Sequence, residues 1–516
     1  MPRPVLSLPL AAFVAVGAGA VSALGFAPYD IWPATLTGLA ILIGLIGTTS
    51  RPRAAFLLGW LFGTGHFAIG LTWIATAFTF QAKMPPMLGW VAVVLLSMFL
   101  ALYLGLAALA ARAMTRDTIA RSFLFAAFWM LAEWLRGWVL SGFAWNPLGA
   151  AALPVAGLGQ LAAVIGALGL SGIVVLAGGS LWAIIEPKAS RTQRLTGAAI
   201  VVVVALAAIL ATTIPTPATN AANPTIVIVQ PNVGQDVKYA PGADEAHLQS
   251  YLRMTRASLA RTARPPALVL WSESSVFGLP EEDPQLRARL AAVLGPGDLL
   301  LFGGVAAIRD KDGQLTALTN SLFVIDAQGT LHGRYDKSHL VPLGEYVPMR
   351  PLMEAIGLAR LTPGDIDFQS GPGPRTLALP GMPAVGGQIC YEIIFAGAVV
   401  DRDHRPQWLA NISNDAWFGP TGPPQHLAQT RLRAIEEGLP MARATPTGIS
   451  AVIDARGQVI AATRLGEAAI VSATLPSSLP PTVFARIGHL ASAMLGVILL
   501  LAGIVIDRTR RGRSGI

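Results

Sequence analysis

Long apolar stretches separated by short basic loops occupy the two ends of this 516-residue chain. Eight of these stretches approach the roughly 20 residues that a helix needs to cross the hydrocarbon core of a bilayer. They lie near residues 8–26, 31–49, 54–78, 87–111, 122–140, 159–185, 195–213 and 487–506. The pattern predicts a multi-pass α-helical membrane bundle, in which seven spans precede a different middle segment and one span follows it.

The basic residues of the loops predict on which side of the membrane each loop lies. Thirteen Lys and Arg residues fall on the side of the two termini, whereas only Lys83 and Arg136 fall on the other side. Because Lys and Arg gather in cytoplasmic loops, we expect both termini in the cytoplasm and the middle segment across the membrane. The first span lacks a small-residue cleavage site, so we interpret it as a retained helix rather than a signal peptide.

Charge and cysteine content narrow the possible function classes. The chain has a net charge of +8, but residues 1–213 carry 11 Lys and Arg against 4 Asp and Glu, and residues 486–516 carry 5 against 1. The excess positive charge therefore flanks the predicted spans, whereas a nucleic-acid partner would require a folded basic face. The single cysteine excludes an intrachain disulfide and a multi-thiolate metal site.

Residues 214–485 alternate between short β-branched runs and amphipathic stretches, after a linker rich in Pro, Thr and Asn. Strands are expected at 225–233, 267–273 and 298–308, and helices at 247–263 and 285–294. The runs Asp326-Ala-Gln-Gly329 and Asp454-Ala-Arg-Gly457 follow apolar segments and suit type I hairpin turns. The alternation predicts an α/β or α+β sandwich, and the segment is long enough to form one core.

Cys390 ends the apolar run AVGGQIC and precedes Tyr391 and Glu392. A lone cysteine after an apolar strand can be a small buried hydrophobic residue. An unpaired thiol in an oxidising compartment is nevertheless a liability unless it is used, and a strand end beside a carboxylate is where a nucleophile would be presented. We therefore treat Cys390 as a candidate nucleophile.

Two kinds of partner could activate this thiol, whose ordinary pKa of about 8.5 leaves it protonated near neutral pH. One is a histidine, and the candidates in the middle segment are His247, His332, His339, His404 and His426. The other is a carboxylate base combined with a lysine. Glu273 ends the strand-like run ALVLWSE, and Lys337 lies in the polar run RYDKSHLVPLGEYVP. Taken alone, each of these two residues could be a solvated surface residue.

Several segments, in order along the chain, resemble one superfamily. WSES, YDKSHLVPLGEYVP and GGQICYE resemble the segments that carry the Glu–Lys–Cys triad of the nitrilase, or carbon–nitrogen hydrolase, superfamily. ISNDAWFG and RATPTGIS are also similar to that superfamily. With its predicted spans, the whole chain resembles the apolipoprotein N-acyltransferase family. The resemblance implies a nitrilase-like αββα sandwich at 214–485, between a membrane domain at 1–213 and a C-terminal span with a basic tail at 486–516.

The resemblance also implies roles for individual residues. Cys390 would be the nucleophile, and Glu273 would be the general base that takes its proton. Lys337 would stabilise the oxyanion, together with the backbone N–H of Tyr391.

Further residues match supporting positions of the family. Glu345 and Glu392 would hold the geometry of the site, Trp417 would lie in a mobile loop over the lipid entrance, and Tyr239 would be a lid residue. The chain departs from the usual family pattern at Tyr239, Ser272, Pro446 and Thr447, and also in the run GFAWNPLGAA at 142–151.

The implied reaction transfers the sn-1 acyl chain of a phospholipid, with phosphatidylethanolamine as the expected donor, through a cysteine thioester. The acceptor would be the N-terminal amine of diacylglyceryl-cysteine in an apolipoprotein. No metal or organic cofactor and no nucleic acid is expected, and nothing demands more than a monomer. The implied location is the bacterial inner membrane, surrounded by membrane lipids, with the catalytic domain in the periplasm.

Three other functions remain open at this point. A membrane-tethered amidase or nitrilase would use the same triad with water as the acceptor. A transporter or receptor would carry a catalytically dead binding domain, and a cysteine–histidine hydrolase would depend on one of the histidines. The pair Glu133 and Arg136, at the end of the fifth predicted span, is either a self-paired ion couple, a lipid-headgroup contact or a buried site in the bundle.

Overall fold

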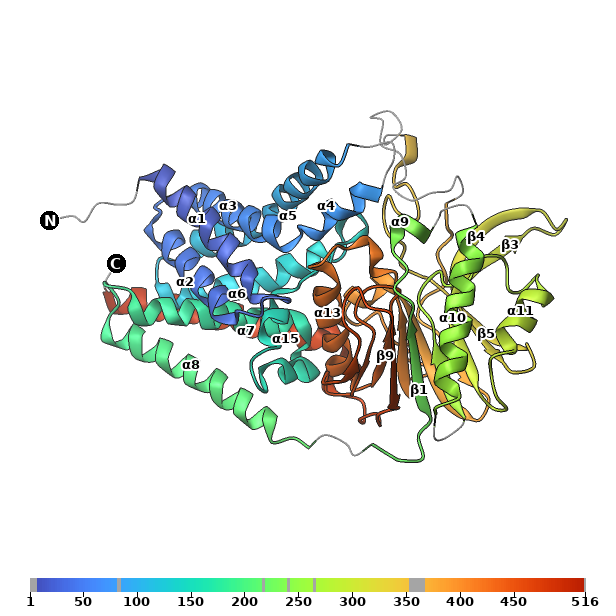
Figure 1. Cartoon of the computed structure of the whole chain (residues 1–516). Helices are drawn as coiled ribbons and strands as arrows, with labels where there is room; N and C mark the ends of the chain where they lie inside the picture. Colours follow the sequence, from blue (N-terminus) through green and yellow to red (C-terminus); the bar gives the residue numbers. More distant parts are fainter. Residues whose placement is uncertain are drawn as a thin grey trace. The chain divides into compact units, whose positions relative to one another are not determined.

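The computed structural model describes residues 7–80, 85–215, 219–238, 242–262, 266–351 and 367–514. The chain forms two compact units, whose elements are labelled in Figure 1. The first unit comprises Met1–Ala75, Pro86–Pro215 and Pro481–Ile516, and the second comprises Thr76–Pro85 and Thr216–Pro480. The short segment Thr76–Pro85 therefore groups with the second unit, although most of its neighbours in the sequence belong to the first.

The first unit is helical. Its α-helices are α1 (Leu8–Ser22), α2 (Trp32–Thr48), α3 (Pro52–Gly70), α4 (Trp73–Ala77, which runs into the second unit), α5 (Met87–Met114), α6 (Thr118–Arg136), α7 (Ala162–Ile185), α8 (Arg191–Thr212), α14 (Val483–Ile487) and α15 (His489–Ser514). Within the described residues, six helices are long and apolar enough to cross a membrane. The structure thus has the multi-pass helical character that the hydrophobic pattern predicts.

Two of the predicted spans differ from single straight helices. The stretch predicted at 54–78 is broken after Gly70, and its two parts are bent by 49°, so that it adds a seventh span only if the bent pair is counted as one. Glycine is a poor helix former, which favours the end of α3 at this residue. The stretch predicted at 31–49 is the apolar helix α2, with 17 residues. The count of eight spans therefore stays a prediction.

A buried polar pair lies at the end of α6. Glu133 Oε1 accepts hydrogen bonds from the indole of Trp129 at 2.9 Å and from the backbone N–H of Leu148 at 2.7 Å. Arg136 donates from Nη1 to the carbonyl oxygen of Trp145 at 2.9 Å. Both side chains are buried. The pair therefore lies inside the helical unit and anchors the segment 145–148 to α6.

The second unit contains two six-stranded sheets. The order in the first sheet is β12 (Ala469–Thr474), β1 (Thr225–Gln230), β2 (Ala267–Leu270), β3 (Leu299–Arg309), β4 (Leu315–Asp326) and β5 (Leu331–Asp336). The order in the second is β11 (Val459–Ala462), β10 (Ala451–Ile453), β9 (Met441–Ala444), β8 (Trp408–Ile412), β7 (Met382–Ile389) and β6 (Thr376–Leu379). The central strands β1–β2–β3 and β7–β8–β9 are parallel, and the outer neighbours are antiparallel.

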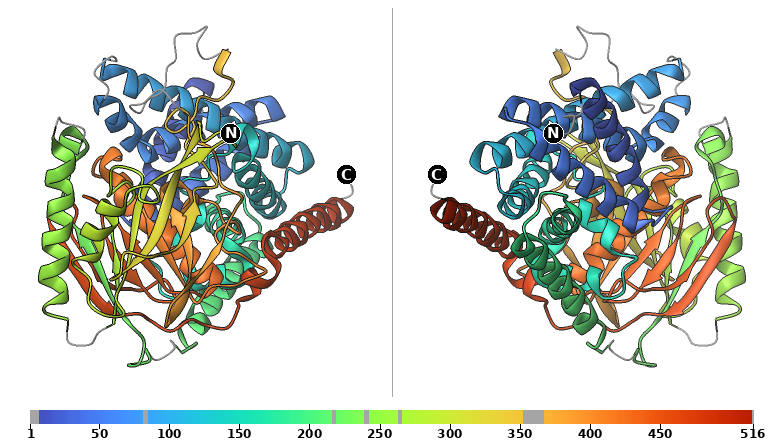
Figure 2. Two further views of the ribbon diagram at one scale, coloured as in Figure 1. Left: turned by 90° about the vertical axis from the view of Figure 1, so that its right-hand side faces the viewer. Right: turned by 90° about the vertical axis from the view of Figure 1, so that its left-hand side faces the viewer.

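The layers of this unit follow from which side chains each face buries. Ile228 and Leu270 of the first sheet share one core with Ile389 and Ile412 of the second. The other face of the first sheet packs on helices α10 (Ala243–Leu259) and α11 (Pro284–Ala291), and Figure 2 shows α10 running along it. Helix α13 (Gly422–Glu437) lies beside the second sheet (Figure 1). The predicted αββα sandwich is therefore confirmed.

The predicted local elements occur with shifted ends. The expected strand 267–273 ends as β2 at Leu270, and the expected helix 247–263 is α10. Both hairpin turns are confirmed, because Gly329 and Gly457 donate to Asp326 O and Asp454 O at 3.1 and 3.0 Å. Both glycines have left-handed φ values, +79° and +73°, which a residue without a side chain adopts most easily.

Candidate active site

Glu273 lies three residues beyond the end of β2, where the chain approaches Gly303 of β3 closely. A Cβ atom at Gly303 would lie 2.7 Å from the Cα of Glu273, so only glycine leaves room for this path. The carboxylate is buried and fully engaged. Its Oε1 accepts from Asn320 Nδ2 at 2.8 Å and from Lys337 Nζ at 3.1 Å, and its Oε2 accepts from the backbone N–H of Asn414 at 2.8 Å.

Lys337 follows β5 and is 1% exposed. Its ammonium group contacts two carboxylates, Glu273 Oε1 at 3.1 Å and Glu345 Oε1 at 3.0 Å. Burial opposes the charge, but these two carboxylates outweigh it and hold the pKa of Lys337 above its usual range. The second oxygen of Glu345 accepts from the backbone N–H of Val341 at 2.8 Å, and its first oxygen also accepts from Asn320 Nδ2 at 2.8 Å. Lys337 is thus a fixed cation between two anions.

Cys390 immediately follows β7 and has a left-handed φ of +50°. A non-glycine residue seldom adopts this conformation, and such strain is concentrated at functional sites, where a sharp turn presents a side chain. Burial and the charge of Glu273 raise the pKa of the Cys390 thiol, and the cation of Lys337 opposes this shift only in part. The thiol is therefore neutral at rest, and the charges of both neighbours act on it.

Glu392 ties the turn at Cys390 to the segment that carries Lys337. Its Oε1 accepts from the backbone N–H of Ser338 at 2.6 Å, from the Ser338 hydroxyl at 2.7 Å and from the Tyr335 hydroxyl at 2.7 Å. Its Oε2 accepts from the backbone N–H of Ile389 at 2.7 Å. One buried carboxylate therefore holds the strand before Cys390 and the residue after Lys337 in a fixed relation.

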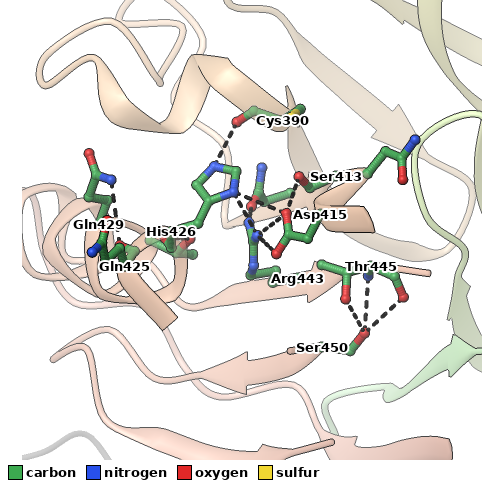
Figure 3. A network of polar contacts seen from close by, with 12 residues as sticks. Cys390, Ser413, Asp415, Gln425, His426, Gln429, Arg443, Thr445 and Ser450 are labelled. Atoms are coloured by element: carbon green, nitrogen blue, oxygen red, sulfur yellow. Dashed lines mark hydrogen bonds and ion pairs between the residues drawn. The ribbon is translucent and has the colours of Figure 1, made fainter. Parts of the chain in front are cut away.

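A second polar network lies behind Cys390 (Figure 3). His426 of α13 is fully buried, and its Nε2 lies 3.2 Å from the carbonyl oxygen of Cys390. Its Nδ1 lies 2.9 Å from Arg443 Nη2 and 3.1 Å from Asp415 Oδ1, and the Arg443 guanidinium contacts both oxygens of Asp415. Figure 3 shows the Cys390 carbonyl turned toward the ring and the sulfur turned away from it. The geometry does not support His426 as the base that takes the thiol proton.

The other candidate histidines have different surroundings. His332 contacts Asp326 at 2.6 Å, His404 has an 82% exposed side chain, His339 stacks on Phe395, and His247 lies near Phe277. The charges that act most strongly on the Cys390 thiol are those of the Glu273 carboxylate and the Lys337 ammonium, and Ser413 also hydrogen-bonds to the thiol. Among the residues that the structure describes, no group of three or more His, Cys, Asp or Glu side chains could hold a metal ion.

The sequence did not predict two residues that contact the site. Asn320 bridges Glu273 and Glu345, and Asn414 supplies a backbone donor to Glu273. Asn320 is an amide two residues before the apolar run 322–325 of β4, which was a usable signal for a buried polar group. The donor of Asn414 is a backbone group, which every non-proline residue has, so no residue type could reveal it.

The roles of the remaining predicted residues stay predictions, and the structure shows the surroundings of three of them. Trp417 ends a short 3₁₀ turn, and its ring lies 5.7 Å from that of Phe80, edge to face. Ser272 shares a 2.6 Å hydrogen bond with the Tyr251 hydroxyl. Tyr391 follows Cys390 and is buried. The predicted lid residue Tyr239 lies outside the described residues.

Two family profiles match the chain, one in each unit. Residues 18–180 match the family described as "Apolipoprotein N-acyltransferase N-terminal domain". Residues 228–480 match the family described as "Carbon-nitrogen hydrolase". The second match contains Glu273, Lys337 and Cys390.

Curated relatives match almost the full length. The apolipoprotein N-acyltransferase of Bradyrhizobium diazoefficiens is 36% identical over 506 residues, which is 96% of this chain and 94% of that protein. That of Rhodopseudomonas palustris is 35% identical over 97% of this chain and 95% of its own length. That of Caulobacter vibrioides is 36% identical over 97% of this chain and 95% of its own length. The similarity therefore covers both units rather than the catalytic fold alone.

Proposed function

Because this chain belongs to the apolipoprotein N-acyltransferase family, we propose that its buried Glu273, Lys337 and Cys390 transfer an acyl chain through a thioester. The protein is an N-acyltransferase of the bacterial inner membrane, and its substrates are a phospholipid and a lipoprotein. The membrane-tethered amidase is not favoured, because the match to these acyltransferases includes the helical unit as well. The single observation that carries the proposal is the buried Glu273–Lys337–Glu345 network beside the strained turn at Cys390.

The first half-reaction forms the thioester. Glu273 takes the thiol proton, and Cys390 Sγ attacks the sn-1 ester carbonyl of the phospholipid. The C–S bond forms, the ester C–O bond breaks, and the proton passes from Glu273 to the departing alkoxide of the lysophospholipid. The raised pKa of the Cys390 thiol supports a proton transfer that occurs only when the substrate is bound. The buried site then holds no thiolate before the substrate arrives.

The charge that develops on the carbonyl oxygen needs donors that are already in place. Lys337 is held as a cation by two carboxylates, and such preorganised charge in a dry site stabilises a tetrahedral intermediate strongly. The backbone N–H of Tyr391, next to the nucleophile, is the proposed second donor. Glu345 and Asn320 are positioning residues, since Glu345 contacts Lys337 and Asn320 contacts Glu273 and Glu345.

The second half-reaction forms the amide. The free α-amine of a diacylglyceryl-cysteine attacks the thioester carbonyl, and Glu273 takes a proton from the amine nitrogen. The C–N bond forms, the C–S bond breaks, and the thiolate of Cys390 recovers its proton from Glu273. No metal or organic cofactor takes part in this scheme.

Several finer features belong to the proposal. The donor is phosphatidylethanolamine, the enzyme acts as a monomer, and no nucleic acid is involved. Both termini lie in the cytoplasm and the catalytic domain, 214–485, lies in the periplasm, with the membrane domain at 1–213 and the last span and basic tail at 486–516. The excess of Lys and Arg in the loops on one side of the predicted spans supports this orientation.

The test is intact mass spectrometry of the full-length protein after incubation with phosphatidylethanolamine and no acceptor. We expect a fatty-acyl mass that hydroxylamine removes, that is absent from Cys390→Ala, and that a diacylglyceryl lipopeptide discharges to its own amine. Folded wild-type protein that acquires no acyl mass would contradict the proposal. An acyl mass that persists in Cys390→Ala would show a different nucleophile.

A further inference from the structure

His426 contacts the backbone of the nucleophile rather than its sulfur. Its Nε2 lies 3.2 Å from the carbonyl oxygen of Cys390, and the ring has no exposed surface. In the proposed mechanism Glu273 makes every proton transfer, and His426 takes part in none. A buried, hydrogen-bonded imidazole directly behind a nucleophile therefore needs an explanation of its own.

The neighbours of the ring determine which nitrogen carries the hydrogen. A carbonyl oxygen can only accept, so Nε2 must be the donor to Cys390. Nδ1 lies 2.9 Å from Arg443 Nη2, which can only donate, and 3.1 Å from Asp415 Oδ1, which can only accept. The shorter contact is with the donor, so we assign Nδ1 as the acceptor. Arg443 Nη2 also contacts Asp415 at 2.8 and 2.7 Å, and one nitrogen with two hydrogens can serve both partners.

The ring is accordingly neutral. Burial and the adjacent Arg443 cation lower the pKa of His426, and the charge of Asp415 opposes them only in part. A doubly protonated ring would place the Nδ1 hydrogen against the Arg443 guanidinium. Arg443 and Asp415 thus select the tautomer that donates to Cys390.

The carbonyl that His426 holds belongs to the same peptide group as the N–H of Tyr391. A trans peptide is planar, and its C=O and N–H point in opposite directions. A hydrogen bond that fixes the Cys390 carbonyl therefore also fixes the direction of the Tyr391 N–H. Such a bond also polarises the amide, which strengthens the N–H as a donor.

We propose that His426 is a positioning residue that aims the backbone N–H of Tyr391 at the oxyanion. This inference rests on the proposed thioester mechanism and deepens it. Cys390 has a left-handed φ of +50°, which is unfavourable for a residue with a side chain. The hydrogen bond from His426 helps to keep the backbone of Cys390 in this conformation. Arg443 and Asp415 act one step further away, by fixing the tautomer of His426.

The experiment compares two reactions of the same sulfur. Acylation by phosphatidylethanolamine passes through an oxyanion. Alkylation by iodoacetamide does not, since the C–S bond forms as the C–I bond breaks, iodide leaves with the electron pair, and the thiol proton goes to solvent. Both are followed on full-length protein by intact mass, with acylation measured in single turnovers over a range of lipid concentrations.

The variants separate the donor from the bulk of the ring. In His426→Gln, the amide nitrogen lies at the same number of bonds from Cα as Nε2 and can donate to the carbonyl. His426→Phe keeps a ring and removes the donor, and His426→Asn serves if the Phe variant does not fold. His404→Phe is the matched control, because the His404 side chain is 82% exposed.

We expect His426→Phe to lower the saturating acylation rate roughly 10- to 100-fold, with the half-saturating lipid concentration and the alkylation rate close to those of the wild type. His426→Gln should recover most of the rate. A folded His426→Phe that acylates at the wild-type rate would overturn the inference, as would equal loss of acylation and alkylation. If the wild type itself forms no thioester, the proposed function fails first, so the two failures are distinguishable.

Discussion

Glu273 Oε1 and Lys337 Nζ lie 3.1 Å apart inside the catalytic unit, although 64 residues separate them along the chain. Their side chains are 7% and 1% exposed. A buried charge that loses its partner is strongly destabilising, so each residue sustains the other. This contact fixes the position of Glu273, the proposed base, and also keeps Lys337, the proposed oxyanion stabiliser, protonated.

Replacement of Lys337 by Met should test this dependence. It leaves the buried carboxylates of Glu273 and Glu345 without their cation, and the expected loss of unfolding free energy is about 3–5 kcal/mol. Acylation should be abolished. Thermal unfolding of the detergent-solubilised protein, followed by tryptophan fluorescence, measures the loss of stability. The double variant Lys337→Met with Glu273→Gln should recover part of the stability but no acylation activity.

The charge of Glu273 predicts opposite effects on two reactions of Cys390. Because that charge raises the pKa of the thiol, Glu273→Gln should lower it and increase the thiolate fraction. Alkylation by iodoacetamide near pH 8 should then become faster, while acylation falls roughly 100-fold or more because the base is gone. Mass spectrometry measures both rates. Slower alkylation in this variant would contradict the assignment.

Two adjacent glycines in β3 provide a matched pair. In Gly303→Ala the new Cβ would meet Glu273 Cα and Ser272 O at 2.7 Å, both backbone contacts that cannot yield cheaply. We expect a loss of about 1–3 kcal/mol in stability, as for other overpacked sites, with a large loss of acylation. In Gly304→Ala the nearest atom, on Phe323, would be 3.4 Å away. That control should keep wild-type activity.

Stability at low pH should depend on Asp415. Burial opposes its ionisation, but the adjacent Arg443 cation outweighs burial and holds the pKa of Asp415 below its usual range. A carboxylate whose pKa is depressed on folding contributes stability that is complete above its unfolded pKa of about 3.9 and is lost as the pH falls toward the folded value. Asp415→Asn should therefore flatten the fall in melting temperature below about pH 4. The control Asp312→Asn, at an exposed position, should leave the dependence of the melting temperature on pH unchanged.

Short-range patterns predicted much of the fold. Asp326 and Gly329 alone specify a hairpin turn, because the first side chain accepts from the next backbone N–H groups and the second adopts a left-handed φ. The apolar stretches predicted the helical unit in the same way, although not the bend after Gly70. The strand 267–273 was predicted to be too long, because periodicity does not reveal that the chain turns beside Gly303.

The sequence by itself determined which side chains are candidates for the chemistry. The motif segments around Glu273, Lys337 and Cys390 identified a carboxylate, a lysine and a thiol, whereas the same residues read singly left a histidine base equally possible. Only the tertiary structure decided which atoms meet. The Asn414 backbone N–H contacts Glu273 across 141 residues, and His426 contacts the Cys390 carbonyl across 36. Such contacts depend on the pairing and packing of strands far apart in the chain, and no local preference of a residue encodes them.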